Sequence, residues 1–297
     1  MEKLSFPEWR PLLFRKALDN LRELIRRREL IRFLVTSNLK SSQKNTFLGY
    51  LWWLMSPLLL MLVYTAMMFI LDRGRVLPAY PMFLFAALLP WQSFQGALQE
   101  SVAAISKNES LIKRVPFPKA VIPISLVISN FVECLIGFVV LIVIGLFFGI
   151  YPTWHYVFLP IPLLVMVTLT LGLSLCFSFF GVWFRDLENI LKFVLRLWWY
   201  MSPGLYALFM VEAMARTKPW LVTLFKLNPF ATLLPAIHSA VYFPGIASSK
   251  PDMQHIAAQG MAFDWIGLGI WFAVSVGIVV VGYVMFVNNE HKFGKVL

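Results

Sequence analysis

The chain has 297 residues, of which 59% are hydrophobic and only 14% are charged, and its formal net charge is +11. A soluble domain of this length carries about 25% charged residues, so the composition excludes an ordinary soluble protein and indicates a polytopic membrane protein. Cys134 and Cys176 both lie inside apolar runs, which excludes a disulfide framework, and the scattered histidines disfavour a metalloenzyme.

Residues 1–45 carry repeated charges and lack an apolar stretch long enough for a secretory signal, so we expect a cytoplasmic segment. Between residues 8 and 34, leucine, isoleucine and phenylalanine recur near helical spacing among arginine and glutamate. This pattern predicts an amphipathic helix that lies on the cytoplasmic membrane surface. The alternative is an ordinary basic flank of the first span, which needs no apolar stripe.

Six apolar runs are long enough to cross a bilayer, which takes about 20 helical residues. These predicted spans are residues 46–71, 78–99, 120–150, 153–184, 187–211 and 265–287. Pro160 and Pro162 predict a break in the fourth run, which exceeds the minimum length. Glu133 lies deep in the third run, and we interpret it as a carboxyl hydrogen-bonded between helices rather than as a proton or substrate site. Near the start of the fifth run, Lys192 and Arg196 can snorkel toward the interface.

Basic residues set the expected orientation of these spans. If both termini are cytoplasmic, 20 lysines and arginines lie inside and six lie outside. The tail, residues 288–297, is then also cytoplasmic. This asymmetry explains the positive charge as membrane topology rather than as nucleic-acid binding.

Residues 107–118 form a charged segment between the second and third spans, on the predicted cytoplasmic side. A bare connection needs only to be polar, whereas this segment has a charged stretch that can form one or two helical turns, followed by Pro116 and Pro118. We expect such a structured element to be presented to a partner protein.

Residues 212–264 are expected to lie outside, between the fifth and sixth spans. Their first part, 220–240, is apolar but is broken at Asn228-Pro229 and Pro235. Each half is too short to span, a pattern typical of re-entrant or interfacial helices. The alternative is a seventh span, which would place the tail outside against the charge bias.

Two further patterns bear on function. The chain has no Gly-x-x-x-x-Gly-Lys-Ser/Thr sequence, so it cannot hydrolyse ATP by a phosphate-binding loop of its own. Aromatic residues cluster near span ends, as in the membrane-interface belt, although aromatic faces also stack on sugar rings. A stand-alone carrier or channel should show inverted repeats and mid-membrane polar groups, and an integral membrane transferase should show a catalytic constellation; neither pattern is evident.

Several short motifs, in order, resemble those of the permease subunit of ABC-2 type polysaccharide or polyol-phosphate exporters. They are Leu-Gly-x-x-Trp at 48–52 with Pro57, Leu-Pro-Trp-Gln-Ser-Phe at 89–94, residues 108–118, Phe-Arg-Asp-Leu at 184–187 with Ser202-Pro203, and Leu-Asn-Pro-Phe at 227–230. The resemblance covers the chain from about residue 32 to its end.

This resemblance implies a homodimer that works with two separate nucleotide-binding subunits. ATP and Mg would bind to those subunits, and this chain would bind no cofactor and be no enzyme. The cargo would be a lipid-linked anionic glycopolymer, with wall teichoic acid preferred over O-antigen or capsular polysaccharide, and the basic cytoplasmic face would attract its pyrophosphate. The protein would be located in the bacterial cytoplasmic (inner) membrane.

The expected fold is an all-α polytopic membrane protein with six transmembrane helices, an N-terminal amphipathic interfacial helix, and re-entrant external gate helices between the fifth and sixth spans. Contact with the ATPase is assigned to Asn108, Glu109, Ser110, Leu111, Ile112, Lys113 and Arg114, with Arg185 and Asp186 as the second contact. The substrate entrance and path are assigned to Lys40, Lys44, Tyr50, Trp52, Trp53, Trp91 and Phe94. The plug of the external gate is assigned to Phe225, Phe230 and Leu234.

Overall fold

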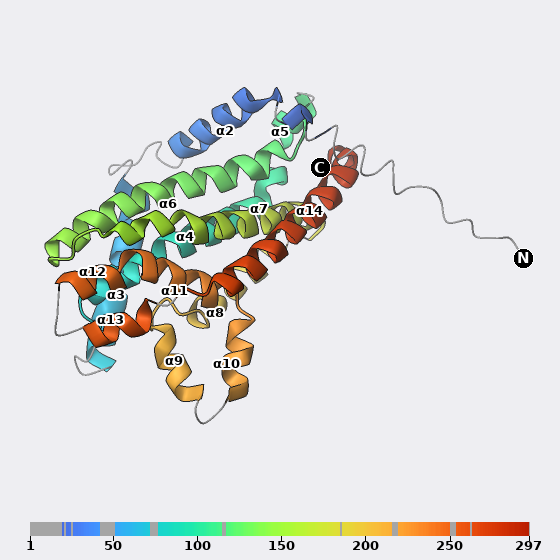
Figure 1. Cartoon of the computed structure of the whole chain (residues 1–297). Helices are drawn as coiled ribbons and strands as arrows, with labels where there is room; N and C mark the ends of the chain where they lie inside the picture. The colour runs from blue at the N-terminus through green and yellow to red at the C-terminus, as the bar shows by residue number, and fades with distance from the viewer. Residues whose placement is uncertain are drawn as a thin grey trace, which may run out of the picture.

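Long helices make up most of the described chain, and no strand occurs in it (Figure 1). The computed structural model describes residues 20, 22–24, 26–41, 51–71, 77–114, 117–184, 186–215, 219–249, 254–261 and 263–296. In chain order the longer helices are α2 (Arg28–Ser41), α3 (Leu51–Leu71), α4 (Tyr80–Lys107), α6 (Val121–Phe147), α7 (Pro160–Trp183), α8 (Leu187–Tyr200), α11 (Phe230–Val241) and α14 (Trp265–Val296). The shorter ones are α5 (Glu109–Arg114), the 3-10 helix η1 (Trp154–Phe158), α9 (Leu208–Ala215), α10 (Pro219–Lys226), α12 (Phe243–Ser249) and α13 (Gln254–Gly260).

Five helical segments of the described chain are long and apolar enough to cross a membrane. They are Leu54–Leu71, Val121–Phe147, Trp154–Trp183, Phe230–Ser249 and Ala258–His291. Four of them coincide with predicted spans. The predicted spans 78–99 and 187–211 are not among them, whereas the segment Phe230–Ser249 covers α11 and α12, which the sequence pattern assigned to the external region.

The predicted fifth span is not one helix. α8 ends at Tyr200, residues 201–207 form turns and bends, and α9 begins at Leu208. The 14 residues of α8 cover about 21 Å, well short of the roughly 30 Å of a bilayer core. Pro203 cannot donate a helical hydrogen bond, which explains the break. At the next position a Cβ on Gly204 would lie 2.4 Å from the Trp199 ring, so the turn folds back tightly onto α8.

The predicted break in the fourth run is confirmed. The short helix η1 precedes α7, and Pro160 is the first residue of α7, where its missing N–H costs no helical bond.

α4 is the central helix of the molecule. It contacts α3, α6, α7, α8 and α11, and many of its side chains, such as Phe83, Phe85 and Phe94, are fully buried. Close approach of α7 to its neighbours depends on small residues, as in membrane helix pairs generally. A Cβ on Gly172 would lie 2.7 Å from the backbone of α14, and one on Gly181 would lie 2.0 Å from a carbonyl of α4.

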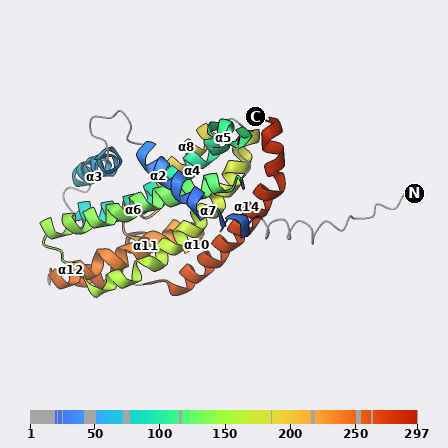
Figure 2. The same ribbon diagram turned by 90° about the horizontal axis from the view of Figure 1, so that it is seen from above.

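The ends of the bundle carry different elements. α5 and the C-terminal end of α14 lie together at one end, and α12 lies at the other (Figures 1 and 2). α9 and α10 project from the side of the bundle as a pair (Figure 1). We call the end that holds α5 the α5 end.

The predicted helix of residues 8–34 corresponds in part to α2, which begins at Arg28 and continues to Ser41. Residues 8–19 lie outside the described residues. α2 packs along α6, where the Asn38 carboxamide lies 3.4 Å from the Ser125 hydroxyl. This side of α2 therefore packs against α6. The amphipathic sequence pattern could not tell a side that packs against protein from a side that faces the membrane.

Candidate functional site

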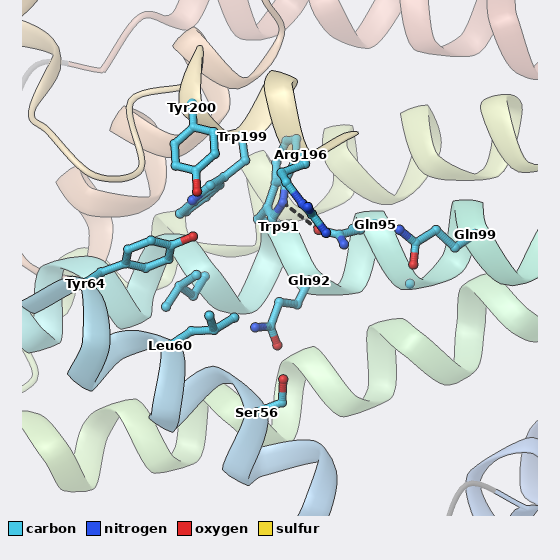
Figure 3. Close-up of a pocket in the computed structure, with 12 residues that line it drawn as sticks. Ser56, Leu60, Tyr64, Trp91, Gln92, Gln95, Gln99, Arg196, Trp199 and Tyr200 are labelled. Atoms are coloured by element: carbon cyan, nitrogen blue, oxygen red, sulfur yellow. Dashed lines mark hydrogen bonds between the residues drawn. The ribbon is translucent and has the colours of Figure 1, made fainter. Parts of the chain in front are cut away.

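A pocket of about 350 Å³ lies between α3, α4 and α8 (Figure 3). We call it the central pocket. Its lining consists of Ser56, Leu60, Tyr64, Leu88, Trp91, Gln92, Gln95, Gly96, Gln99, Arg196, Trp199 and Tyr200. The set combines aromatic rings with carboxamides, hydroxyls and one guanidinium, and no carboxylate is among these lining residues.

The α4 side of the central pocket is a stripe of glutamines. Gln92, Gln95 and Gln99 follow one another at spacings of three and four residues, which places them on one face of the helix. The Trp91 indole N–H donates a hydrogen bond to Gln95 Oε1 at 3.0 Å, the dashed line in Figure 3. Each carboxamide carries both donors and acceptors, so the stripe can bind hydroxyl groups along its length.

The α8 side supplies Arg196, Trp199 and Tyr200. Trp199 is 4% exposed, and its indole N–H lies against the Tyr64 hydroxyl of α3. Arg196, which was interpreted from sequence as a snorkelling residue, is exposed and lines the central pocket.

Beside the central pocket, four aromatic side chains from three helices meet. We call them the aromatic node: Trp91 and Phe94 of α4, Trp198 of α8, and Phe230 of α11. The Phe230 ring lies 4.8 Å from the rings of both Trp91 and Phe94 and 5.6 Å from Trp198, measured between ring centroids. Edge-to-face pairs at these separations are favourable, so the node fastens α11 against α4 and α8.

Asn228 fixes the position of the aromatic node. Its Oδ1 accepts hydrogen bonds from Trp198 Nε1 at 2.8 Å and from the Phe230 backbone N–H at 3.0 Å. Its Nδ2 donates to Ser202 Oγ at 2.9 Å and to the Met201 carbonyl at 3.2 Å. The motifs at 202–203 and 227–230, which are separate in the sequence, are thus joined by one side chain.

The predicted plug residues do not gather in one place. Phe230 and Leu234 are fully buried on α11 inside the protomer. Phe225 is half-buried on α10, where its ring lies 6.2 Å from that of Tyr206. The break at Asn228-Pro229 separates α10 from α11 and so separates Phe225 from the other two residues. The second predicted break, at Pro235, is wrong, because α11 continues through this residue to Val241.

The predicted path residues also differ in their placement. Trp91 lines the central pocket and Phe94 is buried in the aromatic node. Lys40 is exposed at the end of α2. Lys44 and Tyr50 lie outside the described residues, as do the side chains of Trp52 and Trp53 in the first turn of α3. The sequence interpretation missed the glutamine stripe, Tyr64 and Arg196, although the spacing of the glutamines in an apolar run was a readable signal.

The predicted coupling segment is helical, as expected. α5 covers Glu109–Arg114, and an ion pair of 2.5 Å joins Lys113 Nζ to Glu109. The Asn108 carboxamide donates to the Ala104 carbonyl at 2.8 Å, which bridges the end of α4 and the start of α5. Ile112 is buried and Leu111 half-buried, whereas Ser110, Lys113 and Arg114 are exposed. Asp186 is exposed just before α8, and Arg185 lies outside the described residues.

Glu133 is half-buried on α6, one turn beyond Asn130. The Asn130 carboxamide donates to Glu100 of α4 at 2.9 Å. Glu100 is thus a second carboxylate on the helix that packs against α6. It is part of α4 because this helix extends beyond residue 99, the predicted end of the span, to Lys107.

Comparison with known proteins identifies relatives over most of the chain. The chain is 32% identical over 251 residues to the O-antigen export system permease protein RfbA of Myxococcus xanthus, covering 84% of this chain and 94% of that protein. It is 31% identical over 207 residues to the protein of the same name from Klebsiella pneumoniae, covering 69% and 77%. It is 25% identical over 232 residues to the polysialic acid transport protein KpsM of Escherichia coli, covering 75% and 85%.

The sequence pattern of the family described as ABC-2 type transporter matches residues 29–242. This range extends from α2 to the end of α11 and includes the central pocket, α5 and the aromatic node. With the O-antigen export permeases as relatives, the chain belongs to the ABC-2 type transporter membrane family.

Proposed function

We propose that this chain is the membrane subunit of an ATP-driven exporter that moves a lipid-linked cell-surface polysaccharide across the bacterial cytoplasmic membrane. The relatives are named as O-antigen export permeases and a polysialic acid transport protein, which supports polysaccharide as the cargo. The observation that carries the proposal is the central pocket, where a glutamine stripe on α4 faces aromatic rings of α3 and α8.

The chemistry of the central pocket suits a polyhydroxylated chain in transit. Tyr64 and Tyr200 offer aromatic rings that can lie against the apolar faces of sugars, while the carboxamides exchange hydrogen bonds with hydroxyls. Arg196 can bind an acidic sugar or a phosphate. Several weak, repeated contacts of this kind allow the polymer to slide, because no single contact binds it tightly.

In this proposal the chain acts as a homodimer with two separate nucleotide-binding subunits, which hold ATP and Mg. α3 packs against α4 along one side, and Leu62, Val63 and Ile70 on it are 57%, 61% and 75% exposed. The second copy would cover part of this apolar face and bring the two central pockets to a common axis. The exposed Ser110, Lys113 and Arg114 of α5, with Arg185 and Asp186, would contact the ATPase.

The finer topology is part of the same proposal. Six spans would include α4 and the broken α8–α9 segment, both termini would be cytoplasmic, and α10 and α11 would form the external gate. The aromatic node would keep the gate closed, with Phe230 as its central ring. Opening would move α11 away from Trp91 and Trp198 and join the central pocket to the outside.

The names of the relatives favour O-antigen or capsular polysaccharide over the wall teichoic acid preferred from sequence. The test is deletion of the gene and complementation with wild type, with a Gln92→Ala, Gln95→Ala, Gln99→Ala triple variant, and with the exposed control Gln254→Ala. We expect deletion and the triple variant to remove surface polysaccharide and to accumulate the lipid-linked polymer inside the cell, with the control unaffected.

Normal surface polysaccharide in the deletion strain, with loss of teichoic acid instead, would contradict the assigned cargo. Normal polysaccharide export by the triple variant would show that the central pocket is not part of the substrate path. Export by the chain in a strain without any nucleotide-binding partner would favour the alternative, a stand-alone carrier.

A further inference from the structure

At the α5 end, three segments that are distant in the sequence meet. They are the stretch around Asn20, the residues that follow α5, and the last turns of α14. We call the contact the C-terminal joint and define it by Asn20, Lys119, Tyr283, Glu290 and Phe293. None of these residues belongs to the central pocket or to the predicted ATPase contact.

Glu290 links the three segments. Its Oε1 accepts a hydrogen bond from the Asn20 carboxamide at 3.0 Å, and its Oε2 accepts one from the Lys119 backbone N–H at 3.4 Å. The Lys119 ammonium donates to the Glu290 backbone carbonyl at 2.5 Å. The Tyr283 hydroxyl, two turns earlier on α14, donates to Asn20 Oδ1 at 3.3 Å. One carboxylate thus holds two other segments to α14.

Apolar packing continues the joint to α5. Ile112 of α5, Leu24, Phe286 and Phe293 are buried in one hydrophobic cluster. The Lys119 ammonium lies 5.7 Å from the centre of the Phe293 ring, within the range of a cation–π contact. Burial lowers the pKa of Lys119, and the charge of Glu290 opposes that shift. The polar groups of the joint are half-buried beside this cluster, and their hydrogen bonds hold one another in place.

The other end of α14 reaches the proposed gate. The helix has 32 residues and is therefore about 48 Å long. Near its start, a Cβ on Gly267 would lie 3.0 Å from the Thr232 side chain of α11. Along its middle it packs closely on α7, since a Cβ on Gly282 would lie 2.7 Å from the Gly172 carbonyl. α14 thus touches the joint at one end and α11 at the other.

We propose that Glu290 is a positioning residue for transport, whose carboxylate fastens the chain that leaves α5 to α14, so that a displacement of α5 moves α14. The inference rests on the proposed docking of the ATPase on α5. Without the link, α5 would still bind and stimulate the ATPase, but only its apolar packing with α14 would pass its movement on.

The experiment uses the full complex, with the chain and its nucleotide-binding subunits in proteoliposomes, and measures polymer exported per ATP hydrolysed. The variants are Glu290→Ala, Glu290→Gln, Asn20→Ala, and the Asn20→Ala/Glu290→Ala pair. His291→Ala, an exposed neighbour on α14, is the matched control. A Lys113→Glu/Arg114→Glu variant of α5 tests the docking itself.

We expect Glu290→Ala to retain ATP hydrolysis while export per ATP falls roughly two- to thirtyfold, the range for residues that modulate coupling between sites. The pair should be no worse than Glu290→Ala, because both changes break the same link. Glu290→Gln keeps an acceptor for Asn20, so its export per ATP should fall less. This variant provides the test if the alanine variant does not fold. The control should match wild type.

Wild-type export per ATP in both Glu290 variants, while the α5 variant separates hydrolysis from export, would overturn this inference and leave the proposed function intact. If the α5 variant instead assembles and exports like wild type, the proposed docking is wrong and the inference falls with it. Equal losses of hydrolysis and export in the Glu290 variants would show a structural role and would also overturn it.

Discussion

Replacing Asn228 with alanine should loosen the contact of α11 with α8. The side chain makes four hydrogen bonds, to Trp198, Phe230, Ser202 and Met201. Hydrogen bonds between helices of membrane proteins average about 0.6 kcal/mol, so the four together predict a loss of about 2–3 kcal/mol in the free energy of unfolding. Asn228→Asp keeps the Oδ1 acceptor and loses the two Nδ2 donations, so we expect about half of that loss.

The assay is denaturant unfolding in mixed micelles, followed by tryptophan fluorescence, with Asn189→Ala as the control because Asn189 is exposed on α8. Trp198 also reports directly, since its indole N–H loses its acceptor in the alanine variant. An Asn228→Ala protein as stable as the control would refute the argument that this side chain holds the aromatic node together. An aspartate variant as unstable as the alanine variant would show that the donor bonds carry the effect.

The remaining predictions concern the gate, the path, the ATPase partner and the topology. Phe230→Ala should increase the leak of small ions through proteoliposomes at rest, because it removes the ring that contacts Trp91, Phe94 and Trp198; an unchanged leak would contradict the role of the node as a gate. Tyr200→Ala removes a half-exposed ring from the lining of the central pocket, so export should slow while ATP hydrolysis persists; unchanged export would mean that this ring does not meet the polymer. The purified chain alone should hydrolyse no ATP, and robust hydrolysis without a partner would refute the inference from the missing phosphate-binding loop. A single cysteine at position 110 should react only from the cytoplasmic side and one at position 254 only from outside; labelling of position 110 in intact cells would contradict the orientation.

Local features were predictable from sequence where a few neighbouring residues decide the structure. The charged run before Pro116 and Pro118 predicted α5, and Pro160 predicted the start of α7, because each signal acts on its own turn. The sequence Ser202-Pro203-Gly204 also signalled a break within residues 187–211. The prediction of a single span there gave more weight to the length of the apolar run. Helix α8 therefore ends at Tyr200 rather than crossing as a single span.

The candidate site could be predicted only in part, because it depends on contacts between distant segments. Trp91 and Phe94 were assigned to the path and Phe230 to the gate, yet nothing in the sequence placed their rings together. Arg196 reads as a snorkelling residue until the fold shows the pocket that it lines. Glu290 lies in a tail that the sequence analysis assigned only to the cytoplasmic side, and its partners Asn20 and Lys119 are 270 and 171 residues away in the sequence.

We propose above that this chain and a separate ATPase together export a lipid-linked polysaccharide. The most direct measurement reconstitutes the chain with its nucleotide-binding subunit in proteoliposomes and follows a labelled lipid-linked O-polysaccharide across the membrane. We predict transport that requires both proteins and hydrolysable ATP and that is strongly reduced by the Gln92→Ala, Gln95→Ala, Gln99→Ala variant. Transport by the chain without the ATPase, or none of this polymer with both proteins and ATP present, would contradict the account.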